Sequence, residues 1–241
     1  PYHLCMSNLL KILIFGLIST YSHSKEFSCG MAVGYGPFQY LSNGVKSGVD
    51  TEVVEAFNSL GPNTITLIAD KWDSLVSELY HIKGINCLVG TEMTPSRLNR
   101  FKFSIGIYSR FSTMVVTKDS LAKGFADLSG GRVCGDKDSA LEYDINASKV
   151  PIRLVYMETK SKCIKALKSG DVDAAIMPRR VANFLSKEHD VEVREIPRIS
   201  KSIDVGFAFK KNDPINLTSF NDQLKRLVKT EKFKSILKKY E

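Results

Sequence analysis

The sequence has little of what membrane-spanning and metal-binding proteins need. It contains no apolar run near the ~20 residues that a helix requires to cross a bilayer. It has only 4 His and 5 Cys, and the spacings of its cysteines match no zinc pattern. No repeat or low-complexity segment is present. We therefore expect a folded protein that has no metal site and needs no cofactor.

Positive charge is in excess but is not concentrated. Lys and Arg number 34 and Asp and Glu 26, which gives a net charge of +8. The lysines are scattered, and no basic stripe with interleaved aromatic residues occurs, so we expect no nucleic-acid partner. The densest basic run, 229–239, places Phe233, Ile236 and Leu237 at helical spacing and predicts an amphipathic C-terminal helix.

The N-terminal region has the layout of a secretory signal peptide. From Met6 to Ser24 a short polar start with one Lys leads into an apolar core, 9–18, and then into small and polar residues. Residues 1–24 are thus assigned to a signal peptide and upstream residues, with a buried N-terminal helix as the alternative. Export to the periplasm is expected. Removing Lys11 leaves 33 basic against 26 acidic residues, about +7.

Four cysteines lie beyond this segment: Cys29, Cys87, Cys134 and Cys163. An exported protein can form disulfides, but the spacing does not tell which residues pair. Cys87 and Cys134 lie in strand-like apolar runs, so we expect these two to be small core residues, as buried free cysteines commonly are.

Strand-like and helix-like segments alternate along the chain, which predicts an α/β protein with ligands at the carboxyl ends of its strands. The expected strands are 27–34, 64–68, 86–89, 113–117, 132–135, 155–158, 173–177 and 205–209, and the expected helices include 49–60, 72–80, 139–146, 160–168 and 179–186.

The stretch 90–97, Gly-Thr-Glu-Met-Thr-Pro-Ser-Arg, holds the clearest candidate binding residues. Thr94 suits an N-cap and Pro95 a first helical residue, so a helix should begin here with Arg97 in its first turn. A guanidinium beside a helix start can receive a carboxylate. The alternative is an ordinary capped helix with a surface arginine.

A series of motifs in order resembles the extracellular solute-binding proteins of family 3, which include periplasmic amino-acid receptors of ABC importers. The resemblance extends from about residue 28 to 241. It is carried by Tyr35–Phe38, Gly48–Asp50, Trp72–Leu75, Gly90–Arg97, Phe103-Ser104, Asp127–Val133, Gly170–Ala174 and the tail from Lys210 to Tyr240.

The resemblance implies the two-lobed type II periplasmic binding protein fold, with two mixed sheets flanked by helices and joined by two crossover strands. Lobe one would comprise residues 25–113 and 204–241, and lobe two residues 114–203. A monomer would close on a small solute by hinge motion and present it to an ABC importer in the inner membrane. A membrane sensor as the partner remains the alternative.

Matching positions give the candidate site. Arg97 would pair with a ligand carboxylate, helped by backbone groups near Gly90 and Glu92 and by Ser139 of lobe two. The aromatic side chains expected to sandwich the solute are Tyr35, Phe38 and Trp72, and core packing is the alternative for each.

Two positions depart from the amino-acid-binding pattern. Pro178 stands where relatives carry the acidic residue that accepts the ligand ammonium, and Glu92 stands where a Thr or Ser is usual. Either Glu92 has taken over cation binding or pairs with Arg97, or the ligand is not an α-amino acid, which we favour. Arg179 or Arg180 could then hold a second acidic group. A dehydratase-like enzyme with Glu92 as acid or base is the least favoured alternative, so we expect no catalytic residues.

Overall fold

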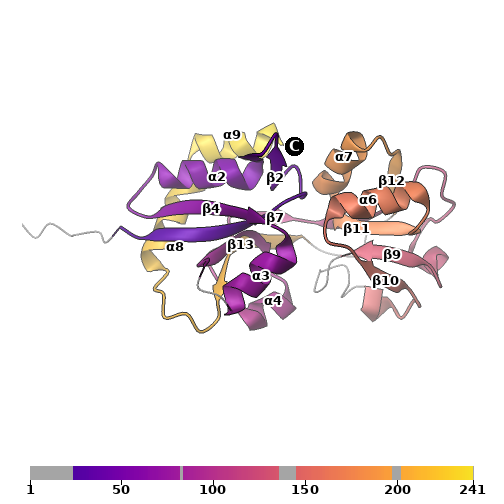
Figure 1. Cartoon of the computed structure of the whole chain (residues 1–241), viewed down its shortest axis with the longest axis horizontal. Coiled ribbons are helices and arrows are strands. Elements are labelled where there is room, and N and C mark those ends of the chain that lie inside the picture. Colours follow the sequence, from indigo (N-terminus) through magenta and orange to yellow (C-terminus); the bar gives the residue numbers. More distant parts are fainter. Residues whose placement is uncertain (1–23, 82–83, 136–144, 197–201, 241) are drawn as a thin grey trace, which may run out of the picture.

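The computed structural model describes residues 24–81, 84–135, 145–196 and 202–240, which form two lobes side by side (Figure 1). The sheet of the first lobe has the strand order β4-β1-β5-β13-β6, and β7 also pairs with β13. Its strands are β1 (Glu26–Ala32), β4 (Thr64–Asp70), β5 (Cys87–Glu92), β6 (Phe101–Phe103), β7 (Tyr108–Arg110) and β13 (Ile203–Lys210). Strand β1 runs parallel to β4 and β5, whereas β13 is antiparallel to its neighbours.

Helices cover both faces of this sheet (Figure 1). They are α2 (Val49–Asn58), α3 (Trp72–His81), α4 (Pro95–Arg100), α8 (Thr218–Leu227) and α9 (Glu231–Lys239). The predicted C-terminal helix is confirmed as α9, which buries Phe233 and Ile236. A small hairpin of β2 (Tyr40–Ser42) and β3 (Val45–Ser47) projects from the lobe.

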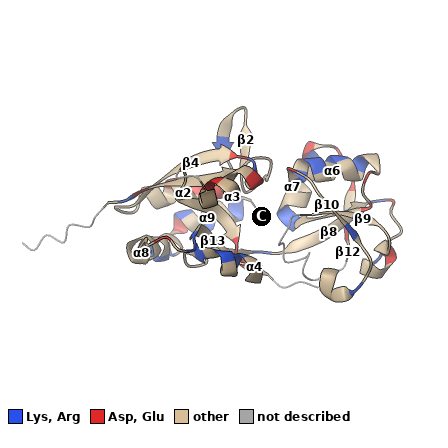
Figure 2. Ribbon diagram, turned by 60° about the horizontal axis from the view of Figure 1, so that its bottom comes forward, with Lys and Arg blue, Asp and Glu red and all other residues tan. Residues whose placement is uncertain are grey.

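The second lobe has a five-stranded sheet of order β10-β9-β11-β8-β12. Its elements are β8 (Ser112–Thr117), η1 (Phe125–Leu128), β9 (Arg132–Gly135), β10 (Arg153–Tyr156), α6 (Lys160–Ser169), β11 (Ala174–Pro178), α7 (Arg179–Glu188) and β12 (Val193–Ile196). Strand β8 is antiparallel to both of its neighbours, so this sheet is mixed too. Lys and Arg occur on both lobes (Figure 2).

The chain passes between the lobes twice. It leaves the first sheet after β7 and enters the second with β8, and it returns from β12 to β13. The predicted two-lobed α/β fold is confirmed, whereas the single-residue lobe boundaries at 113/114 and 203/204 stay predictions. Within the described ranges, no helix is long and apolar enough to cross a membrane, and the proposed signal peptide lies almost wholly outside these ranges.

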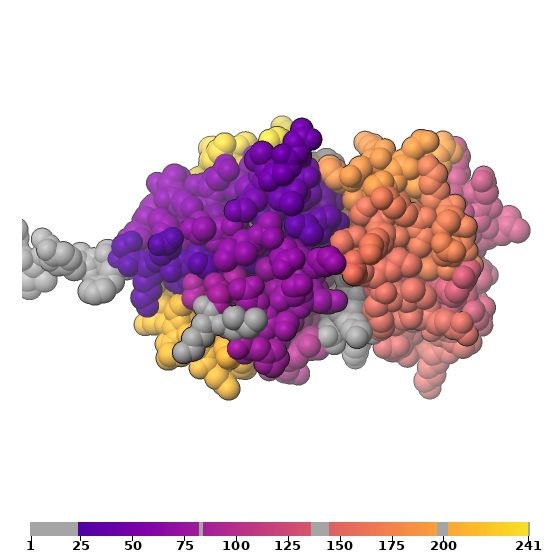
Figure 3. All heavy atoms as spheres, viewed as in Figure 1, coloured from indigo at the N-terminus to yellow at the C-terminus, as the bar shows by residue number. Residues whose placement is uncertain are grey.

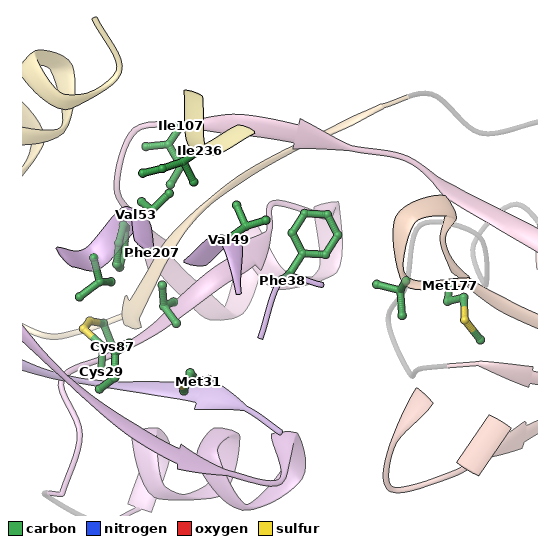
Figure 4. Close-up of a cluster of buried hydrophobic side chains, with 14 of the residues drawn as sticks. Cys29, Met31, Phe38, Val49, Val53, Cys87, Ile107, Met177, Phe207 and Ile236 are labelled. Atoms are coloured by element: carbon green, nitrogen blue, oxygen red, sulfur yellow. A yellow bond between two sulfur atoms is a disulfide. The ribbon is translucent and has the colours of Figure 1, made fainter. Parts of the chain in front are cut away.

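The expectation for the cysteines needs a correction. Cys87 and Cys134 are buried, as expected, but each is half of a disulfide: Cys29 bonds to Cys87, and Cys134 to Cys163. Cys29 and Cys87 are register partners on the adjacent strands β1 and β5 (Figure 4). Strand adjacency brings the two thiols together, and the order of strands in a sheet cannot be inferred from the local apolar run that surrounds each cysteine.

Removing the Cys134–Cys163 disulfide should lower the stability of the fold. The double substitution Cys134→Ala/Cys163→Ala is expected to reduce the free energy of unfolding by about 2–4 kcal/mol, because the bridge closes a loop with a sequence separation of 29 residues. Urea denaturation of the oxidised chain measures this change. A denaturation midpoint that responds neither to the double substitution nor to a reductant would contradict the assignment.

Candidate binding site between the lobes

A cavity of about 60 Å³ lies where the two lobes meet. The first lobe supplies the ends of β1 and β5 and residues of α3, α4 and β7, and the second lobe supplies the start of α6. Its lining includes Tyr35, Trp72, Gly90, Glu92, Arg97 and Arg110 from the first lobe and Glu158, Thr159 and Lys160 from the second. In the space-filling view the lobes contact each other along a seam (Figure 3).

Helix α4 begins as the sequence predicts. Thr94 has extended backbone angles and its side chain accepts a hydrogen bond from the Arg97 amide at 3.3 Å, while Pro95 is the first helical residue. This cap fixes the first turn, and Arg97 in that turn is buried against the cavity. The alternative, in which Arg97 is an exposed surface arginine, is therefore wrong.

The Arg97 guanidinium has two close neighbours, Glu92 and Trp72. Its Nη1 lies 3.8 Å from the Glu92 carboxylate and 3.5 Å from the Glu92 carbonyl oxygen. Its Cζ lies 5.2 Å from the centroid of the Trp72 ring, within cation–π distance. Close charge-assisted hydrogen bonds measure about 2.7–2.9 Å, so the contacts with Glu92 are loose and the guanidinium can accept a better-placed carboxylate.

Most of the sequence-predicted site residues meet at this cavity. Arg97, Trp72, Tyr35, Gly90 and Glu92 all line it. Ser139 falls outside the described residues. What the lining residues bind stays a prediction.

Phe38 and Arg179 lie elsewhere. Phe38 is buried in the first lobe, where its ring stacks on Tyr108 with the ring planes 6° apart, beside Val49 (Figure 4). Arg179 forms a 2.6 Å ion pair with Glu195 on β12 and does not line the cavity. A direct ligand contact by either residue is thus not supported, because Phe38 is used as core and Arg179 is turned toward its own lobe's sheet.

Beneath the cavity lies a buried polar network that the sequence analysis missed. Arg110 forms a 2.9 Å ion pair with Asp50 and donates to the Gly90 carbonyl at 2.8 Å. Tyr108 donates to Asp50, and Gln39 donates to Asp50 at 2.7 Å and accepts from the Ala32 amide. The network therefore ties α2, the ends of β1 and β5, and the strand that precedes the crossing into one unit.

Burial and neighbouring charge fix the protonation states in this network. Burial raises the pKa of Tyr108 well above its ordinary value, and Asp50 raises it further, so the phenol stays neutral and donates. Burial by itself lowers the pKa of Arg110, but the charge of the neighbouring Asp50 carboxylate opposes this; the pKa is raised on balance, so the guanidinium stays charged. Arg110 also lies 3.8 Å from the centroid of the Phe38 ring.

Gly90 belongs to both the network and the cavity wall, as do Gln39 and Arg110. Its φ is +59°, a left-handed conformation that favours glycine. A Cβ at this position would lie 2.0 Å from Asp50 Oδ2 and 2.5 Å from Gln39 Nε2. Glycine is thus required here by both backbone conformation and space.

The second lobe contributes a short segment at the start of α6. Thr159 caps this helix by accepting from the Lys162 amide at 3.2 Å, and Lys160, its first residue, is buried and donates to the Ile176 carbonyl at 3.0 Å. Glu158 lies at the rim, 3.3 Å from Lys71 of the first lobe and 2.7 Å from Lys162. An ion pair thus bridges the lobes beside the cavity.

Lys160 is one of the lining residues that sequence reasoning missed, together with Arg110, Glu158 and Thr159. It lies in the second lobe, as does Pro178, which is buried at the end of β11. A lysine at a helix start has no distinctive local signal, and only the packing of the two lobes brings it to the cavity. No cluster of three or more His, Cys, Asp or Glu that could hold a metal ion occurs among the described residues.

Comparison with known proteins identifies the class that this fold and cavity define. Residues 27–241 match the bacterial extracellular solute-binding proteins, family 3, and the chain belongs to this family.

The individual proteins that resemble this chain are identical to it at about a fifth to a quarter of the aligned positions. The chain is 24% identical over 181 residues to ABC transporter arginine-binding protein 1 of Escherichia coli (strain K12), covering 75% of this chain and 72% of that protein. A Salmonella typhimurium periplasmic binding protein described as having high arginine specificity is similar in fold, with a TM-score of 0.79, 20% identity, and 89% and 98% of the two chains covered. An ancestral amino-acid-binding protein described as a precursor of cyclohexadienyl dehydratase has a TM-score of 0.76, 22% identity, and 97% and 99% coverage.

Proposed function

We propose that this protein captures a small carboxylate-bearing solute between its lobes in the periplasm and presents it to an ABC importer. The observation that carries the proposal is the buried guanidinium of Arg97 in the interlobe cavity, where it has only loose contacts with Glu92. A buried cation with spare donors favours an anionic group, and a planar guanidinium favours a carboxylate because it can form two parallel hydrogen bonds.

The charges around the cavity support the same class of ligand. The charged side chains that line the cavity are those of Arg97, Arg110, Lys160, Glu92 and Glu158, and they sum to +1. Including their ion-pair partners Asp50, Lys71 and Lys162 gives +2. An anion, or a zwitterion whose ammonium faces Glu92, therefore suits the cavity better than a dication such as a polyamine.

Closure of the lobes would couple binding to recognition by the importer. The cavity is lined from both lobes, so a bound solute contacts both at once and stabilises the closed arrangement by its higher affinity for it. Family membership and the names of the relatives support import as the purpose of this closure.

A thermal-shift screen tests the proposal directly. Residues 25–241 would be heated with amino acids, dicarboxylates, aromatic acids and polyamines. A true ligand at ~100 times its dissociation constant stabilises the fold by about 2.7 kcal/mol. For a chain of this size, that raises the melting temperature by roughly 5–10 °C.

The outcomes separate binding from other activities. Shifts that are confined to carboxylates, with the solute recovered unchanged afterwards, would support a binding protein. Shifts by polyamines alone would contradict the proposed anion site, and conversion of a prephenate-like acid would point to an enzyme instead.

A further inference from the structure

We propose a second ligand subsite, the outer chamber, which receives an aromatic or branched apolar tail of the solute whose carboxylate binds Arg97. This inference rests on the proposed function and specifies its substrate class. The outer chamber is a cavity of about 310 Å³ between α3 and β6 of the first lobe and the end of β10 of the second.

The outer chamber adjoins the inner cavity through shared walls. Trp72, Arg97 and Glu158 line both spaces, so a ligand that contacts Arg97 in the inner cavity lies next to the outer one. The two spaces thus form one bipartite site, in which Arg97 stands at the junction.

The inner cavity and the outer chamber differ in size. The inner space of about 60 Å³ is the smaller of the two and would receive the head group at Arg97. The adjoining space of about 310 Å³ has room for a tail attached to that head group.

The chemistry of the outer chamber points to an apolar tail. Trp72, Val76 and Phe101 line it from the first lobe, and Tyr156 and Met157 from the second. Arg97 already rests 5.2 Å from the Trp72 centroid, so an aryl ring attached near the carboxylate would lie along the same indole. Rings and a thioether offer stacking and apolar burial to such a tail.

Charged groups also border the chamber, but in balanced number. Asp73 and Glu158 are opposed by Arg97 and Arg100, and Arg100 Cζ lies 6.0 Å from the centroid of Phe101. No net charge therefore favours a second ionic group in the tail, so the solutes expected here are carboxylates with aryl or branched alkyl tails.

Paired probes test the inference by calorimetry on residues 25–241. Each pair shares a head group and differs in the phenyl ring: alanine with phenylalanine, lactate with 3-phenyllactate, and propionate with 3-phenylpropionate. We expect the phenyl member of at least one pair to bind at least about tenfold more tightly, because the ring leaves water for an aromatic surface.

Filling the outer chamber should remove the preference for phenyl probes and leave the binding of short probes nearly unchanged. Val76→Trp projects an indole into the outer chamber but alters no residue of the inner cavity, so phenyl probes should lose about tenfold in affinity while short probes change less than twofold. Ser77→Trp, at the neighbouring exposed position of α3, is the matched control. Met157→Trp fills the chamber from the other lobe and replaces Val76→Trp if that variant does not fold.

Each outcome bears on one of the two claims. Equal affinity within all pairs, or phenyl binding unaffected by both filling variants, would overturn the outer chamber while leaving carboxylate binding intact. Failure of every short and phenyl carboxylate to bind would overturn the proposed function and the outer chamber with it.

Discussion

Replacing Arg97 with alanine is expected to abolish the thermal stabilisation that a carboxylate solute gives, while the ligand-free chain still unfolds cooperatively. A hydrogen bond to a charged group contributes about 1.5–3 kcal/mol, so losing two of them weakens binding by more than about 100-fold. The measurement is a thermal-shift titration with the solute that stabilises the unsubstituted chain most.

The ligand-free fold should tolerate this change because Arg97 makes only loose contacts. Its separation from the Glu92 carboxylate is 3.8 Å, and the short helix α4 keeps its Thr94 cap. Arg153→Ala, on an exposed position of β10, is a control that removes the same charge away from the cavity. Ligand shifts in the Arg97 variant equal to those in the control would show that Arg97 is not the anchor.

The largest expected effect on stability comes from the buried pair of Asp50 and Arg110. Asp50→Ala is expected to lower the free energy of unfolding by about 3–5 kcal/mol, because it leaves a buried guanidinium without its counter-charge. The side chains of the pair are 1% and 2% exposed. Tyr108 would lose its acceptor at the same time, and Gln39 would keep only the Val89 carbonyl. Urea denaturation under oxidising conditions measures the loss.

A surface pair supplies the comparison for this prediction. Glu192 pairs with Lys118 at 2.8 Å, yet both side chains are mostly exposed. Glu192→Ala should change the denaturation midpoint little, because water and side-chain entropy offset such contacts. If Asp50→Ala cost no more than Glu192→Ala, the buried network would not be a main support of the cavity floor.

The sequence predicted the elements that have long periodic patterns. The segments 49–60, 72–80 and 160–168 appear as α2, α3 and α6, and 132–135 is β9 as predicted. The short strands β2, β3, β6 and β7 were missed, because three residues are too few to show a period of two. Strand β10 begins two residues earlier than predicted.

Some residues of the candidate site could likewise be predicted from local sequence signals, and others could not. Arg97 was found because Thr94 and Pro95 give a local helix-start signal that precedes it. Arg110 and Asp50 give no such signal: they lie 60 residues apart, and their pairing depends on how β7 and α2 pack. Phe38 and Arg179 were expected to contact the ligand because their positions in the sequence fit the motif. Their side chains instead pack within their own lobes, so the structure gives these roles no support.

The sequence by itself determined the α/β class, the resemblance to a two-lobed binding protein, the cap of α4 and the position of Arg97, because each depends on contacts between residues close in the chain or on motifs read in order. Only the tertiary structure decided the pairing of the four cysteines, the network under Gly90, the entry of Lys160 into the cavity and the outer chamber beside Trp72. These features arise where segments distant in sequence pack together, and the local pattern of neither segment contains that contact.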